Sequence, residues 1–206
     1  MVLLSDNDIV FELARSNLLG EFLTIVNCPP NQIWVLPTLF HVARKRLKDD
    51  SAAQAALEAF RPNVLSIPAA SAGAIVLFDG LDVGEQQMFA VLVDHGGTTE
   101  LVTGDKRALS AVASIASNAS PVATAIANRV YCLELLMLRL IRQHGFALVN
   151  SRVTAGTSKN VAIEVCFGAH RTQAEAEAYL KGYLNELTGT CSFLLKDQMP
   201  VEGTAR

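Results

Sequence analysis

The sequence predicts an α/β protein with a three-layer α/β/α arrangement around a central, mainly parallel sheet, followed by a C-terminal helical extension. Short apolar runs typical of buried strands alternate with helical patterns as far as about residue 150. Half of the 206 residues are hydrophobic and only 18% are charged, so the chain can bury a sizeable core. Beyond that point the alternation stops. We therefore expect a domain at residues 1–150 and an extension at residues 151–206 that packs on the core or on a partner.

The elements of the domain follow from periodicity and from residues that start or stop helices. Strands are expected at residues 2–4, 33–36, 100–103 and 129–132, and residues 64–67 fit a strand or a connector. Helices are expected from residue 8, at residues 37–48, from a capping box at residues 51–54, and at residues 68–78, 81–93, 105–117 and 133–144.

The extension has its own helical signals. Residues 153–158 are polar and are expected to be flexible, whereas residues 160–167 fit either a helix or a strand. A second capping box at residues 172–175 starts a helix with one apolar face. That face consists of Ala176, Leu180, Tyr183, Leu184 and Leu187. It suits packing on the core, with a homodimer as the alternative.

Composition narrows the class of protein. The four cysteines form no CxxC pair, so neither a zinc site nor a disulfide framework is expected. No secretory signal is visible, and the most apolar helical stretch, residues 130–141, is too short to span a bilayer. We expect a cytoplasmic protein that does not enter membranes. The net charge of -3 gives no general attraction to nucleic acid, so such binding needs a local basic patch.

Three acidic residues are placed to meet. Asp6 follows the first strand and Asp105 follows the strand at residues 100–103. In a parallel sheet these strand ends open on one crevice. Glu85 shares a helix face with Met88 and Phe89 and should point toward the sheet. Each acid could instead serve a helix N-terminus, but their combination favours a site.

Such a group of carboxylates requires a cation, because like charges in one crevice repel each other. Oxygen ligands without supporting His or Cys favour Mg²⁺ or Mn²⁺. That ion can activate water and stabilise charge on a phosphodiester. Asp8 and Asp82 lie near the three acids in sequence and are expected to support the site as further metal ligands.

Three segments resemble the PIN-domain family. Residues 2–10, VLLSDNDIV, are similar to its opening motif, residues 81–88 to its Gly-Glu helix, and residues 101–106 to its later strand ending in Thr-x-Asp. The resemblance covers residues 2–145. It implies a PIN fold and metal-dependent cleavage of RNA or, less often, DNA, with Asp6, Glu85 and Asp105 as catalytic residues. Many relatives are toxins of toxin–antitoxin pairs, which makes an antitoxin a candidate partner.

The chain also departs from the family pattern. His41 occupies a position where PIN domains often have Glu, and Glu134 is the candidate to replace a later acid of the family. The extension is not part of a minimal PIN domain. A PIN-like binding or regulatory module without catalysis is therefore one alternative. The other is a haloacid-dehalogenase-like phosphatase, because residues 6–10 resemble its Asp-x-Asp motif, although Glu85 would then have no role.

Phosphate contacts are expected from basic residues near the acids. Arg44 and Lys48 share a helix face, and Lys106 and Arg107 directly follow Asp105. Contacts of this kind are independent of sequence and weaken with salt. Lys45 and Arg46 belong to the same basic cluster as Arg44 and Lys48, and for these two a solvated helix face is favoured over a phosphate contact.

Overall fold

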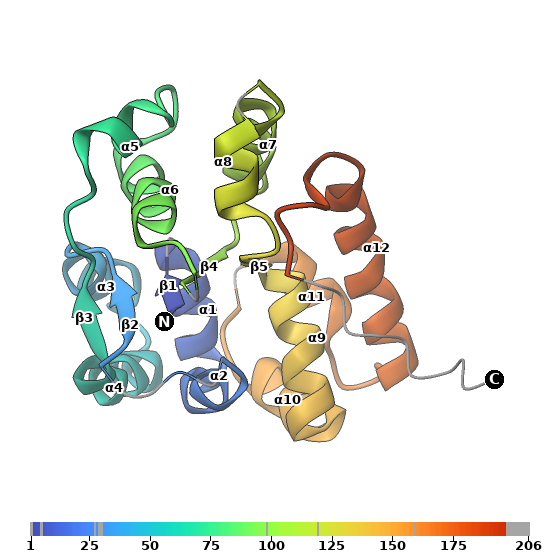
Figure 1. The fold of residues 1–206 in the computed structure, drawn as a ribbon. Coiled ribbons are helices and arrows are strands. Elements are labelled where there is room, and N and C mark those ends of the chain that lie inside the picture. Colours follow the sequence, from blue (N-terminus) through green and yellow to red (C-terminus); the bar gives the residue numbers. More distant parts are fainter. Residues whose placement is uncertain are drawn as a thin grey trace.

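The computed structural model describes residues 2–4, 6–26, 28, 31–97, 99–118, 120–158 and 160–196. It shows a mixed α/β fold built on one five-stranded parallel sheet with the strand order β3-β2-β1-β4-β5 (Figure 1). The strands are β1 (Val2–Leu4), β2 (Ile33–Val35), β3 (Val64–Ser66), β4 (Glu100–Thr103) and β5 (Val130–Cys132). The expected α/β class and the parallel pairing are confirmed.

Helices connect and follow the strands. Before β4 these are α1 (Asn7–Arg15), α2 (Leu19–Ile25), α3 (Leu39–Arg46), α4 (Ser51–Phe60), the 3-10 turn η1 (Arg61–Asn63), α5 (Ala72–Val76) and α6 (Val83–His95). After β4 these are α7 (Lys106–Asn118), α8 (Ser120–Ile126), α9 (Leu133–His144), α10 (Phe146–Ala155), α11 (Val161–Cys166) and α12 (Gln173–Cys191).

The central position of β1 decides where the polar residues meet. Leu4, in β1, is in register with Val35 of β2 on one side and with Val102 of β4 on the other. All pairings are parallel, so the carboxyl ends of β1, β2 and β4 reach the same edge of the sheet. Residues that follow these strands are therefore neighbours although they are far apart in the sequence.

One continuous apolar core joins the domain to the extension. Phe11, Phe22, Phe78 and Phe89 are fully buried in it. The extension adds to the same core, because α10 packs on α9, and α12 packs on both α9 and α7 (Figure 1). The apolar face predicted for α12 is buried except at Tyr183, which is half-buried. This face therefore covers the chain's own core.

The second capping box is confirmed and the first is wrong. Thr172 accepts from Glu175 N, and Glu175 accepts from Thr172 N in return. At α4 the N-cap is Asp50, whose carboxylate accepts from Ala53 N at 2.9 Å. An aspartate one residue earlier is a strong acceptor, so Ser51 becomes the first helical residue instead of the cap.

Two other predicted segments are also wrong. Within residues 68–78 only Ala72–Val76 is helical, because Ser71 is held as the N-cap by hydrogen bonds to Asp94. Residues 153–155, expected to be flexible, are the end of α10, where Val153 is buried in the core. The helix α8, which the sequence pattern did not indicate, lies between α7 and β5.

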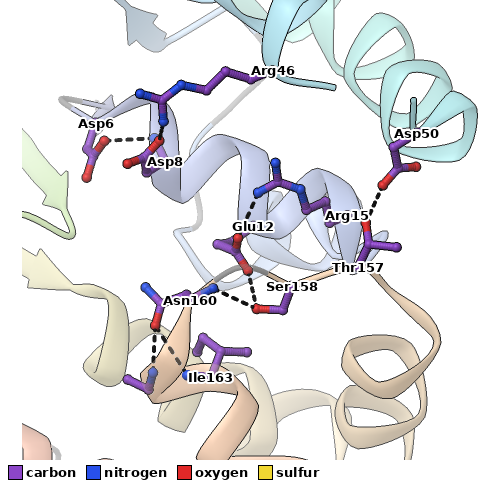
Figure 2. A network of polar contacts seen from close by, with 11 residues as sticks. Asp6, Asp8, Glu12, Arg15, Arg46, Asp50, Thr157, Ser158, Asn160 and Ile163 are labelled. Atoms are coloured by element: carbon purple, nitrogen blue, oxygen red, sulfur yellow. Dashed lines mark hydrogen bonds and ion pairs between the residues drawn. The ribbon is translucent and has the colours of Figure 1, made fainter. Parts of the chain in front are cut away.

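A short connector, residues 156–158, fixes the extension to α1 and α4 (Figure 2). Ser158 donates to Glu12 Oε2 at 2.6 Å, and Thr157 donates to Asp50 Oδ2 at 2.5 Å. At Gly156 the backbones approach so closely that an added Cβ would lie 2.5 Å from the carbonyl oxygen of Arg15. The extension is thus attached by directed polar contacts as well as by apolar packing.

In the part of the chain that the structure describes, the four cysteines are buried free thiols: Cys28, Cys132, Cys166 and Cys191. In those same ranges no helix has the length and apolar character needed to cross a bilayer.

Candidate functional site

The acidic residues meet in one open pocket at the carboxyl ends of β1 and β4. The pocket has a volume of about 260 Å³. Its lining residues are Asp6, Asn7, Asp8, Leu36, Arg46, Asp82, Gly84, Glu85, Thr103 and Asp105. All five predicted acidic residues are among them. They come from the start of α1, the start of α6 and the turn between β4 and α7.

Asp6 is fixed by the start of α1. Its Oδ1 accepts from Asp8 N at 2.7 Å, which makes Asp6, and not Asp8, the N-cap of that helix. The β4–α7 turn lies against its other oxygen, since a Cβ at Gly104 would be 3.1 Å from Asp6 Oδ2. Burial, together with the negative charges of Asp8 and Asp105, raises the pKa of Asp6 above its usual value.

Glu85 is held at the start of α6 by a reciprocal capping box. Asp82 Oδ1 accepts from Glu85 N at 2.9 Å, and Glu85 Oε2 accepts from Asp82 N at 3.3 Å. Burial and the charges of Asp82 and Asp105 raise the pKa of Glu85 to about 7, and a side-chain hydrogen bond shared with Asp105 adds to the rise. The protonated form of Glu85 is thereby favoured more than in an ordinary glutamate.

Asp105 caps α7. Its Oδ1 accepts from Arg107 N at 2.7 Å and from Ala108 N at 2.9 Å, and Thr103 Oγ1 accepts from Asp105 N at 3.1 Å. Asp105 therefore has the helix-capping role that the sequence offers as the alternative to a site. It also places the carboxylate beside Glu85, so capping and membership of the pocket coexist.

Arg46 is the lining residue that sequence reasoning missed. It extends from the last turn of α3 to form an ion pair with the Asp8 carboxylate at the start of α1 (Figure 2). Its guanidinium carbon lies 5.9 Å from the centre of the Phe11 ring. Arg46 is exposed, as expected for a solvated helix face, and it also makes this contact with Asp8. The sequence has no local signal for this contact, because it depends on the pairing of β1 with β2.

The basic residues predicted to contact phosphate do not line this pocket within the described part of the chain. Arg44, Lys48 and Arg107 are exposed elsewhere, as is His41. Lys106 has another role, because its Nζ lies 3.1 Å from Glu134 Oε1 and 4.9 Å from the centre of the Tyr183 ring. Glu134 is buried in this pair and does not replace a pocket acid. The pair joins α7 to α9 and α12.

Comparison with protein-family models, with curated proteins and with solved structures found no match. What the pocket can do therefore has to be argued from its own chemistry.

The carboxylates are not arranged as a ready-made ligand cage. Among the residues that the structure describes, no three His, Cys, Asp or Glu side chains are placed to hold one metal ion. The hydrogen bonds explain this, since Asp6 Oδ1 and Asp105 Oδ1 serve helix caps and Glu85 Oε2 is turned back to Asp82 N. The pocket therefore presents a group of neighbouring acids whose negative charges repel one another.

A second pocket, of about 500 Å³, lies at the opposite edge of the sheet, where β4 and β5 begin. Its buried cation is Arg129, which donates to the carbonyl oxygens of Thr99 at 2.7 Å and Gly96 at 3.0 Å, and also to that of Ala125. Lys196 pairs with Glu100 at the same place. These groups already have partners, so they hold α6, α8 and the segment at Lys196 to the sheet.

Proposed function

We propose that this chain is a PIN-like, divalent-metal-dependent nuclease that hydrolyses phosphodiester bonds, with RNA as its substrate. The observation that carries the proposal is the meeting of Asp6, Glu85 and Asp105, from three distant segments, in one pocket. Within the described part of the chain none of the three forms an ion pair. A group of unpaired acids is costly, and a bound cation would offset that cost.

The chemistry of the donor groups fits Mg²⁺ or Mn²⁺. The pocket offers carboxylate oxygens from Asp6, Glu85 and Asp105, with Asp8 and Asp82 in support, and no His or Cys is among its described lining residues. The raised pKa of Glu85 and its hydrogen bond with Asp105 support this choice, because both indicate that positive charge is favoured at this place. When bound, the ion would supply water activation and charge stabilisation.

Three helix N-termini add positive potential at the pocket. Asp6, Asp82 and Asp105 serve the first turns of α1, α6 and α7, whose free N–H groups favour negative charge. This arrangement tolerates several carboxylates and also favours a phosphate group.

We extend the proposal to a three-layer fold, because right-handed crossovers from β1 outward in both directions would place the connecting helices on opposite faces of the sheet.

A binding or regulatory module without catalysis is the second candidate. The observation that favours it is the lack of a ready three-ligand group among the described residues. The phosphatase alternative has less support, because Asp8 is paired with Arg46 and the nearby Lys106 is paired with Glu134. The proposal also includes an antitoxin-like protein partner, a homodimer and a cytoplasmic location. None of these three depends on the geometry of the pocket.

The test is cleavage of labelled single-stranded RNA with Mn²⁺ or Mg²⁺, with EDTA as a control. Asp6→Asn with Asp105→Asn should abolish cleavage, lowering the rate at least about 100-fold, because metal ligands are lost. Asparagine is also a good N-cap, so both helices should be retained. The matched control is Asp50→Asn, which changes an N-cap aspartate outside the pocket. No cleavage by the unchanged protein, or equal cleavage by the double variant, would reject the nuclease proposal.

A further inference from the structure

Arg46 is the one basic side chain among the described residues that line the acidic pocket. The other lining side chains carry five carboxyl groups. A polynucleotide phosphate that approaches this pocket is repelled by those groups. A guanidinium at the same place supplies a fork of donors that matches two phosphate oxygens.

The present partner of Arg46 is one that it can exchange. The Arg46 and Asp8 side chains are 56% and 61% exposed. An ion pair this exposed contributes little to stability, because water screens both charges. Moving the guanidinium from Asp8 to a phosphate oxygen therefore costs little. The contact with the Phe11 ring supports the side chain at the pocket during that exchange.

The neighbouring basic residues lack this placement. Arg44, on the same helix α3, and Lys48, just after it, are exposed and do not line the pocket in the described structure. Arg46 differs from these two residues in its position on the helix, which places it at the pocket; the local density of positive charge is the same for all three.

We infer that Arg46 is the substrate-contact residue of this pocket and that its guanidinium leaves Asp8 to bind a phosphodiester oxygen of a single-stranded RNA. The inference rests on the proposed function for its substrate class. In this role Asp8 acts as a positioning residue that keeps Arg46 at the pocket when substrate is absent.

The test measures RNA binding without cleavage. Fluorescence anisotropy of a labelled single-stranded RNA is recorded in EDTA at several KCl concentrations, in the Asp6→Asn, Asp105→Asn background, where repulsion is smaller. Arg46→Ala should raise Kd about tenfold and reduce the slope of log K against log salt by about 0.7, the value for one phosphate contact on a single strand. Arg46→Lys should recover part of the affinity, because it keeps the charge without the fork.

Arg61→Ala is the matched control, because Arg61 is an exposed arginine outside the pocket that is likewise paired with an acid, Glu58, and lies over an aromatic ring, that of Phe40. It should leave Kd and the salt slope unchanged. Thermal unfolding of each variant checks folding, which the exposed Arg46 pair hardly affects. Binding of a single-stranded DNA of the same sequence tests whether the pocket prefers the phosphodiester of RNA or that of DNA. Weaker binding of that DNA would support RNA as the substrate, and equal or tighter binding would overturn that assignment.

The outcomes separate this inference from the nuclease proposal. If RNA binding depends on Arg46 but the protein does not cleave RNA, the result supports the Arg46 contact and rejects the nuclease proposal. If the protein cleaves RNA and Arg46→Ala changes neither kcat/KM nor RNA affinity, the Arg46 contact is overturned and the nuclease proposal stands. Equal losses in Arg46→Ala and Arg61→Ala, or no RNA binding by any variant, also overturn the contact.

Discussion

Glu12 and Glu134, which are buried outside the pocket, each have a cationic partner. Asp6 and Glu85, which are half-buried in the pocket, have none among the described residues. Glu12 is 6% exposed, pairs with Arg15 at 2.9 Å and accepts from Ser158. Glu134 is 3% exposed and pairs with Lys106 at 3.1 Å. Asp6 and Glu85, in the pocket, lie beside other acids, and the pKa of each is raised.

This difference separates carboxylates whose charge is matched inside the chain from carboxylates whose charge is not, although Asp6 and Glu85 also take part in helix caps. Where a carboxylate joins elements, as Glu12 joins α1 to the connector, its charge is matched inside the chain. Where the match is missing, the fold carries an electrostatic cost that a ligand can offset. The predictions below test this contrast, from the largest expected effect to the smallest.

Glu12→Ala should lower the free energy of unfolding by about 3 kcal/mol, because it leaves Arg15 buried without its carboxylate partner. Urea denaturation measures the change. The control is Glu58→Ala, because Glu58 and Arg61 have the same spacing and the same 2.9 Å separation but are exposed. That variant should lose less than about 0.5 kcal/mol. Similar losses in both would show that burial does not set the value of such pairs here.

Mn²⁺ or Mg²⁺ at about 100 times its Kd should stabilise the protein by about 2.7 kcal/mol, which is a rise in Tm of about 5–10 °C for a chain of this length. The reason is that the ion binds the folded pocket and not the unfolded chain. Differential scanning fluorimetry measures the shift. Asp6→Asn with Asp105→Asn should abolish it, whereas Asp50→Asn should retain it. No shift in the unchanged protein would contradict the proposed metal site.

Glu85→Gln should raise Tm at pH 8 and not at pH 5. The pKa of Glu85 is raised in the folded state from 4.5 to about 7, so the folded protein loses stability as pH increases through this window. Gln removes the charge and keeps an acceptor for the capping box. Because Glu85 is only half-buried, we expect about 1 kcal/mol, or about 2–4 °C, after solvent screening. An equal effect at both pH values would exclude ionisation as the cause.

Ser158→Ala should cost about 1 kcal/mol, because it removes one hydrogen bond from the connector to the buried Glu12. Thr157→Ala, which removes the hydrogen bond to Asp50, should cost less because that contact is exposed. Hydrogen exchange of α10 and α12 measures whether the extension loosens in each case. A larger effect of Thr157→Ala than of Ser158→Ala would show that the extension is attached mainly through α4.

The sequence predicts those features that depend on local pattern. The strands at residues 33–35 and 100–103, the Thr172 capping box and the meeting of Asp6 with Asp105 all follow from periodicity, caps and strand ends. Arg46 could not be found this way, because its contact with Asp8 exists only when α3 lies beside α1. The pairing of Lys106 with Glu134 was missed for the same reason.

The order of the strands also sets when the pocket can exist during synthesis. β1, made first, is in register with β4, whose residues 100–102 are made nearly a hundred positions later. Until those residues leave the ribosome, Asp6 has no Asp105 beside it, and α1 lacks the β4–α7 turn that approaches its cap. Pairing across such a distance is slow because the loop must close first. For the proposed nuclease, activity is thereby delayed until translation has passed the turn at Gly104.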